Sequence, residues 1–239
     1  MSARFEILDW QDTPMGQLSL RRRHEPVLDV EIYEVQLNDE HLMSSLFTVS
    51  ESELARLGVA GHEADDLDDL DVLVGGLGLG YTAIAALADP RVGSVTVVEA
   101  LEPVIDWHRR RLLPDSVDLA GDPRCRLVHD DFFALVAERR STTRYDVVLL
   151  DIDHTPDHVL HPSHAELYSP RGLGRLASLL RDDGVFALWS DDPPEPGFLA
   201  TLGEVFAETT SHVVTFPNPH TRGVSSCTIY VARDFRPVP

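Results

Sequence analysis

The alternation of apolar and polar positions changes near residue 60. Before that point, short runs such as Val30–Leu37 alternate with a period of two, and turn-forming residues separate the runs. This period is typical of half-buried antiparallel strands. We therefore expect residues 1–60 to form β-hairpins followed by a short helix, which Ser50 caps and which ends near Leu57.

The remainder of the chain, residues 61–239, alternates between apolar runs and helical patterns. Runs such as Asp146–Asp151 are almost continuously apolar, which is typical of parallel strands covered by helices on both faces. We predict an α/β, Rossmann-like domain with a mostly parallel seven-stranded sheet. Its expected strands are Asp71–Gly76, Ser94–Ala100, Cys125–Asp130, Tyr145–Ile152, Gly184–Ser190, His212–Phe216 and Ser226–Arg233. Its expected helices are Tyr81–Ala88, Glu102–Leu113, Phe132–Arg140, Pro170–Arg181 and Gly197–Glu208.

Composition narrows the possible partners. The net charge of −20 argues against nucleic acid and favours a small-molecule substrate, possibly a cationic one, although solubility alone also explains the charge. There is no apolar run of about 18 residues, and the amino terminus lacks a signal-peptide pattern, so we expect a cytoplasmic protein without membrane contact. Cys125 and Cys227 are expected to be free thiols in strands. Exposed edges of the amino-terminal hairpins predict a homodimer.

A glycine-rich turn joins the first predicted parallel strand to its helix. Gly76, Gly78 and Gly80 alternate with Leu77 and Leu79, which allows a sharp reversal and close approach of a ligand to the backbone. The dinucleotide fingerprint would need a third glycine at Tyr81, so it is absent. The observed spacing is typical of class I S-adenosylmethionine-dependent methyltransferases. Gly76, Leu77, Gly78 and Gly80 are therefore candidates for cofactor binding, with a ligand-free tight turn as the alternative.

Acidic residues end the next two predicted strands. The carboxylate of Glu99, followed by Ala100, can accept hydrogen bonds from both ribose hydroxyls. Asp130 or Asp131 can accept from an adenine amino group, and Phe132 can pack on the ring. Because strand ends meet at one edge of a parallel sheet, these residues predict a single crevice. The alternative is that these acids are simply exposed.

Several segments resemble the spermidine synthase family of polyamine aminopropyltransferases. The resemblance extends from about Val72 to Arg233, and it implies a class I methyltransferase fold with a small amino-terminal β domain. It also implies a site for S-adenosylmethionine or its decarboxylated form. The segments that carry it are Val97–Ile105, Asp122–Asp131, Tyr145–His154 and Phe216–Pro219.

The chain departs from the family pattern at reactive positions. The Asp of the family glycine motif, which holds the amine of decarboxylated S-adenosylmethionine, falls on Leu79, and the family Tyr-His-Glu becomes Ser50-Glu51-Ser52. An Asp at position 79 would repel the carboxylate of intact S-adenosylmethionine, whereas backbone amides near Gly78 could hold it. We therefore expect methyl transfer to a small, possibly amine, acceptor. Aminopropyl transfer to a polyamine and a non-catalytic relative are the alternatives.

The loop after the fourth parallel strand is rich in Asp and His. Asp151, Asp153 and His154 are the catalytic candidates: His154, at the catalytic acid's place in the resemblance, as a general base, and an Asp to orient an amine or that imidazole. The alternative is a surface loop. We expect no metal, although Asp151 with Asp191 and Asp192 is a possible magnesium site. Zinc would need other histidines of this loop, namely His158, His161 and His164.

Overall fold

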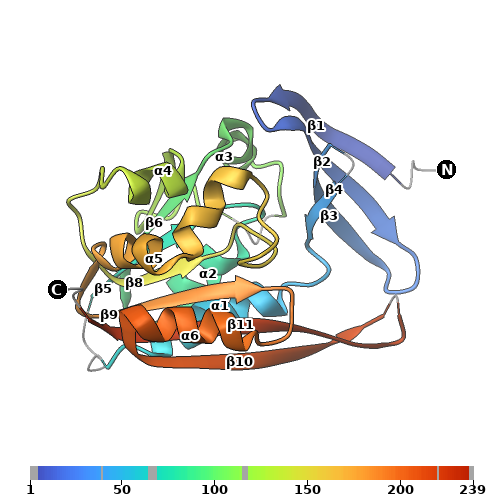
Figure 1. Ribbon diagram of the computed structural model, residues 1–239. Coiled ribbons are helices and arrows are strands. Elements are labelled where there is room, and N and C mark those ends of the chain that lie inside the picture. Colours follow the sequence, from blue (N-terminus) through green and yellow to red (C-terminus); the bar gives the residue numbers. More distant parts are fainter. Residues whose placement is uncertain (1–4, 39, 64–68, 115–117, 220, 237–239) are drawn as a thin grey trace.

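The computed structural model describes residues 5–38, 40–63, 69–114, 118–219 and 221–236, and it contains two sheets (Figure 1). The smaller sheet is antiparallel and four-stranded, in the order β1-β2-β3-β4. It confirms the predicted amino-terminal hairpins. Its strands are β1 (Phe5–Thr13), β2 (Gly16–Glu25), β3 (Val30–Leu37) and β4 (Glu40–Ser44).

The larger sheet is seven-stranded, in the order β10-β11-β9-β8-β5-β6-β7, with β5 to β9 parallel and β10 and β11 antiparallel. It confirms the predicted α/β fold. Its strands are β5 (Leu70–Gly75), β6 (Val92–Glu99), β7 (Cys125–His129), β8 (Tyr145–Leu150), β9 (Leu180–Ser190), β10 (Phe206–Asn218) and β11 (Gly223–Phe235). The helices are α1 (Val49–Ala60), α2 (Tyr81–Ala88), α3 (Glu102–Arg109), α4 (Phe132–Ala137), η1 (Pro162–Tyr168), α5 (Pro170–Ala177) and α6 (Pro196–Val205).

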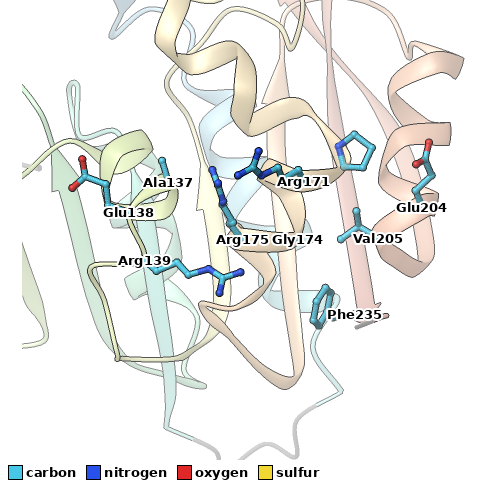
Figure 2. A pocket seen from close by; sticks show the side chains of 10 residues that line it. Ala137, Glu138, Arg139, Arg171, Gly174, Arg175, Glu204, Val205 and Phe235 are labelled. Atoms are coloured by element: carbon cyan, nitrogen blue, oxygen red, sulfur yellow. The ribbon is translucent and has the colours of Figure 1, made fainter. Parts of the chain in front are cut away.

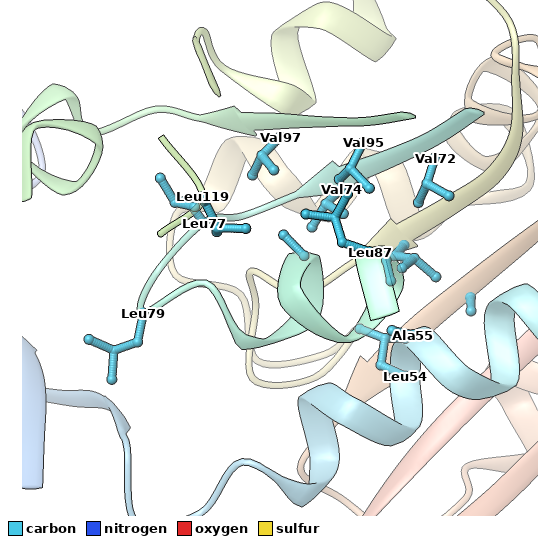
Figure 3. Packing of buried hydrophobic residues seen from close by; sticks show 14 of the residues in the cluster. Leu54, Ala55, Val72, Val74, Leu77, Leu79, Leu87, Val95, Val97 and Leu119 are labelled. Atoms are coloured by element: carbon cyan, nitrogen blue, oxygen red, sulfur yellow. The ribbon is translucent and has the colours of Figure 1, made fainter. Parts of the chain in front are cut away.

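Each face of this sheet has its own hydrophobic core, because successive residues of a strand point to opposite faces. Val72 and Val74 of β5 pack with Leu54 and other side chains of α1, α2 and α3 (Figure 3). Leu73, between them, packs with residues of α4, α5 and α6 on the other face. Continuous burial along β5 explains why its sequence shows no alternation.

The ends of several elements differ from the predictions. Helix α1 begins at Val49, and Ser50 lies inside it, where the Ser50 hydroxyl donates to Glu51 (2.7 Å), so the predicted cap is wrong. Strand β10 is much longer than the predicted His212–Phe216. Exposed polar residues along its first half interrupt the apolar pattern, but the backbone still pairs with β11 from Phe206 onward. Within the described residues no helix is long and apolar enough to cross a membrane.

Candidate active site

A cavity of about 800 Å³ lies at the carboxyl ends of the parallel strands, where the strand order reverses around β5. Open α/β sheets bind ligands at this place. Side chains of β2, β3 and β4 contribute to the wall, so the cavity lies between the two sheets. The predicted site residues that line it are Gly76, Leu77, Gly78, Glu99, Ala100, Asp131, Phe132, Asp151 and His154. Gly80, Asp130 and Asp153 do not line it.

The backbone of the glycine turn requires glycine. Gly76 has a φ of 95°, and a Cβ added there would lie 2.2 Å from the carbonyl oxygen of Asp151. Gly78 and Gly80 also have positive φ, and Gly80 is the N-cap of α2. Non-glycine residues adopt such conformations only with strain. The turn therefore places the end of β5 directly against the end of β8.

The amides of this turn are already hydrogen-bonded. The Gly76 amide donates to Val98 O (3.0 Å), and the Gly80 amide donates to Leu77 O (2.7 Å). The Leu77 amide donates to Glu99 Oε2 (3.0 Å), and the Leu79 amide donates to Met43 Sδ (3.1 Å). The Leu79 side chain is 1% exposed and belongs to the core. Both findings weaken the basis of the methyl-transfer expectation, because four of the five amides of residues 76–80 are already engaged and position 79 does not line the cavity.

Glu99 lies at the end of β6, as expected. Its carboxylate accepts the amides of Leu77 (3.0 Å) and Leu101 (2.8 Å). Burial raises the pKa of Glu99, and these backbone amides partly oppose the rise. A carboxylate with two oxygens at a cavity wall suits a diol, because each oxygen has lone pairs for further hydrogen bonds.

The two acids at the end of β7 have different surroundings. Asp131 lines the cavity and caps α4 by accepting the Ala134 amide (3.0 Å). Asp130 instead accepts from Arg140 at 2.8 Å, away from the wall. Phe132 lines the cavity with 2% of its surface exposed. Of the predicted base-contacting residues, Asp131 and Phe132 therefore line the cavity, and Asp130 does not.

Two further carboxyl groups in the cavity wall, those of Glu51 and Asp151, repel each other. Asp151 accepts from the Thr82 hydroxyl (2.6 Å), and burial raises the pKa of Asp151. Burial, followed by the negative charge of Asp151, raises the pKa of Glu51 in α1 to about 7. Sequence reasoning noted Glu51 only as a departure from the family Tyr-His-Glu. That alignment was the signal that could have identified it as a site residue.

Asp153 and His154 have separate roles in the loop after β8. Asp153 is 1% exposed and accepts from the Leu160 amide (2.7 Å), His164 Nδ1 (2.8 Å) and the Tyr168 hydroxyl (2.8 Å). It holds the loop and does not reach the cavity. His154 does line the cavity, but its Nε2 lies 2.8 Å from Glu40 Oε1 in β4. Asp153, one of the acids expected to orient the His154 imidazole, is therefore paired with His164 instead.

Two further features of the molecule concern metal binding and a second cavity. Among the described residues, no group of three or more His, Cys, Asp or Glu side chains is arranged to hold a metal. The structure therefore gives no support to the magnesium and zinc alternatives within those residues. A second cavity of about 840 Å³ lies among α4, α5, α6 and β11, with Arg139, Arg171 and Arg175 around it (Figure 2). No predicted site residue lines this second cavity.

The fold is Rossmann-like and of the class I methyltransferase type. The chain belongs to the spermine/spermidine synthase domain family, whose model matches residues 54–221. It is 31% identical over 154 residues to polyamine aminopropyltransferase 2 of Pseudomonas aeruginosa, covering 62% of this chain and 43% of that protein. It is also 31% identical over 116 residues to a polyamine aminopropyltransferase of Pyrobaculum islandicum, covering 48% of this chain and 39% of that protein. The chain thus spans less than half the length of these relatives.

Solved structures agree with this assignment of the fold. A spermidine synthase in complex with the transition-state analogue AdoDATO superposes with a TM-score of 0.74 at 18% identity, covering 97% of this chain and 75% of that one. Spermidine synthase from Thermotoga maritima superposes with a TM-score of 0.73, also at 18% identity, covering 97% and 74%. The predicted family and fold are therefore confirmed.

Proposed function

We propose that this chain transfers an aminopropyl group from decarboxylated S-adenosylmethionine to a cationic amine. The observation that carries the proposal is the pair of buried carboxyl groups, Glu51 and Asp151, in the cavity wall. Among the described residues that line the cavity none is Arg, and the chain has no Lys. Such a wall attracts an ammonium group and repels a carboxylate.

The same electrostatics favour one form of the donor. Intact S-adenosylmethionine carries a carboxylate beside its amine, whereas the decarboxylated form carries the amine alone. A carboxylate would meet Glu51 and Asp151 without a guanidinium to offset them, and the amides of Gly76, Leu77, Leu79 and Gly80 are engaged. The names of the relatives, polyamine aminopropyltransferases, support the same choice. Methyl transfer is accordingly not retained.

The residues fit a nucleoside donor and a basic acceptor within this one cavity. Glu99 would accept the ribose hydroxyls, and Asp131 and Phe132 would contact the base. The donor supplies the activated carbon beside its sulfonium. Asp151 would hold the acceptor amine, and Glu51, whose pKa is about 7, would take the proton that the attacking amine releases.

Calorimetry and product analysis test this proposal. We expect the decarboxylated donor to bind more tightly than S-adenosylmethionine, and we expect mass spectrometry to detect an aminopropylated product from a panel of diamines. Asp151→Asn should lower kcat/KM by about 100-fold, because it removes a charged hydrogen-bond acceptor from the reacting amine.

Asp157→Asn is the matched control, since Asp157 is an exposed acid of the same loop. Its kcat/KM should equal that of the wild type. Tighter binding of intact S-adenosylmethionine would refute the choice of donor. Binding without turnover of any amine would instead favour a non-catalytic relative.

A further inference from the structure

His164 occupies a position in the cavity wall that the proposed chemistry does not use. It lines the cavity although only 7% of its surface is exposed. Its ring stacks on Phe133 with centroids 3.6 Å apart and planes 6° apart, and its Nδ1 lies 2.8 Å from Asp153 Oδ1. Stacking and hydrogen bonding together fix the orientation of the ring.

The Asp153 contact also sets which nitrogen of His164 carries hydrogen. A carboxylate only accepts, so in the neutral ring Nδ1 is the donor and Nε2 is left as an acceptor. Nε2 has no hydrogen-bond partner among the described residues, and it is not fully buried. Because His164 lines the cavity, this nitrogen is available to a ligand there.

The neighbours of His164 place it beside the start of α4. Phe133 follows Phe132 at the start of α4, and Asp131 caps the same helix. Asp131 and His164 thus both lie beside the start of α4 in the cavity wall, and each offers a hydrogen-bond acceptor. An exocyclic amino group offers two N–H donors to such a pair, whereas a carbonyl oxygen at the same place would face two acceptors.

We propose that His164 recognises the amino group of the donor's adenine and so determines nucleobase specificity, with Asp153 as a positioning residue. This inference rests on the proposed function, because it assumes a nucleoside donor. It assigns His164 a role in recognition and leaves the acceptor amine to Asp151 and the proton transfer to Glu51.

Binding of two nucleosides that differ at one group tests the role of His164. The probes are 5′-methylthioadenosine, the thioether left after aminopropyl transfer, and 5′-methylthioinosine, which has a carbonyl in place of the amino group. The wild type should prefer the adenine nucleoside by more than about tenfold, because the other probe leaves buried acceptors unpaired.

His164→Asn keeps an amide donor for Asp153 but has no group that reaches the Nε2 position. It should lower the preference by about tenfold. His164→Gln, whose longer amide brings an oxygen near that position, should restore part of it. His158→Asn is the control, since His158 is exposed and does not line the cavity.

The outcomes separate this inference from the proposed function. Unchanged preference in His164→Asn, with both nucleosides still binding, overturns the role of His164 and leaves the proposed function standing. If the wild type binds neither nucleoside, the proposed function fails and the inference fails with it. If His164→Asn does not fold, equal preference in His164→Gln and in His164→Leu decides against the role.

Discussion

Replacing Glu51 by Gln should stabilise the protein, and only above acidic pH. Gln keeps the acceptor for the Ser50 hydroxyl but removes the charge that meets Asp151. Burial, followed by the charge of Asp151, raises the pKa of Glu51 from its ordinary value of 4.5 to about 7. This shift corresponds to about 3 kcal/mol, an upper bound because Asp151 shares the repulsion.

The sign follows from proton linkage. The folded-state pKa lies above the unfolded one, so the native state binds the extra proton, and wild-type stability falls as pH rises from about 4.5 to about 7. At pH 8, above its folded-state pKa of about 7, Glu51 is ionised and buried beside Asp151. We therefore expect Glu51→Gln to equal the wild type near pH 4.5 and to exceed it by up to about 3 kcal/mol at pH 8.

Urea unfolding followed by circular dichroism, at intervals from pH 4.5 to 8, measures this difference. Glu53→Gln is the control on the same helix: the Arg56 hydrogen bond lowers the pKa of Glu53, so this variant should lose less than about 1 kcal/mol at neutral pH, the opposite sign. If the difference between Glu51→Gln and wild type does not change with pH, Glu51 is not a buried carboxyl beside Asp151, and the reasoning is wrong.

Two further predictions concern the turn and the thiols. Gly76→Ala should lower the free energy of unfolding in urea by about 2 kcal/mol or more, because its Cβ would meet the Asp151 carbonyl at a φ of 95°. Gly203→Ala should instead raise the free energy of unfolding by about 0.5–1 kcal/mol, because Gly203 lies in α6 with open space around it. A stable Gly76→Ala protein would contradict the geometry of the turn. Burial raises the pKa of Cys125 to about 12 and that of Cys227 to about 11, so at pH 8 a thiol reagent should label both much faster in urea than in the native protein; equal rates would refute this protection.

The pattern of apolar runs was sufficient to predict the fold. The burial of β5 on both faces and the glycine turn after it are local signals, so their places along the chain could be identified directly. The cap at Ser50 could not, because the start of α1 depends on how the helix packs against the larger sheet. The length of β10 depends on pairing with β11, which compensates for its polar first half.

The site was predictable where the strand ends define it, and less so where loops fold back. Glu99, Asp131 and Asp151 lie at strand ends and line the cavity. Asp153 and His164 are eleven residues apart, and only the folded loop shows that they are partners. Dimerisation through the amino-terminal sheet remains a prediction, consistent with the exposure of Trp10 (50%), and light scattering would test it.

The thioether of Met43 completes the glycine turn from a strand of the other sheet. Its sulfur accepts the Leu79 amide at 3.1 Å and occupies the space beside Gly78. An engineer who transplanted residues 61–239 into another scaffold would leave that amide without its acceptor and open the space beside the turn. Oxidation would have a related effect, since a sulfoxide at Met43 is bulkier and more polar than the thioether. Peroxide treatment should therefore disrupt the Met43 contacts with the turn and leave the carboxylates chemically unchanged.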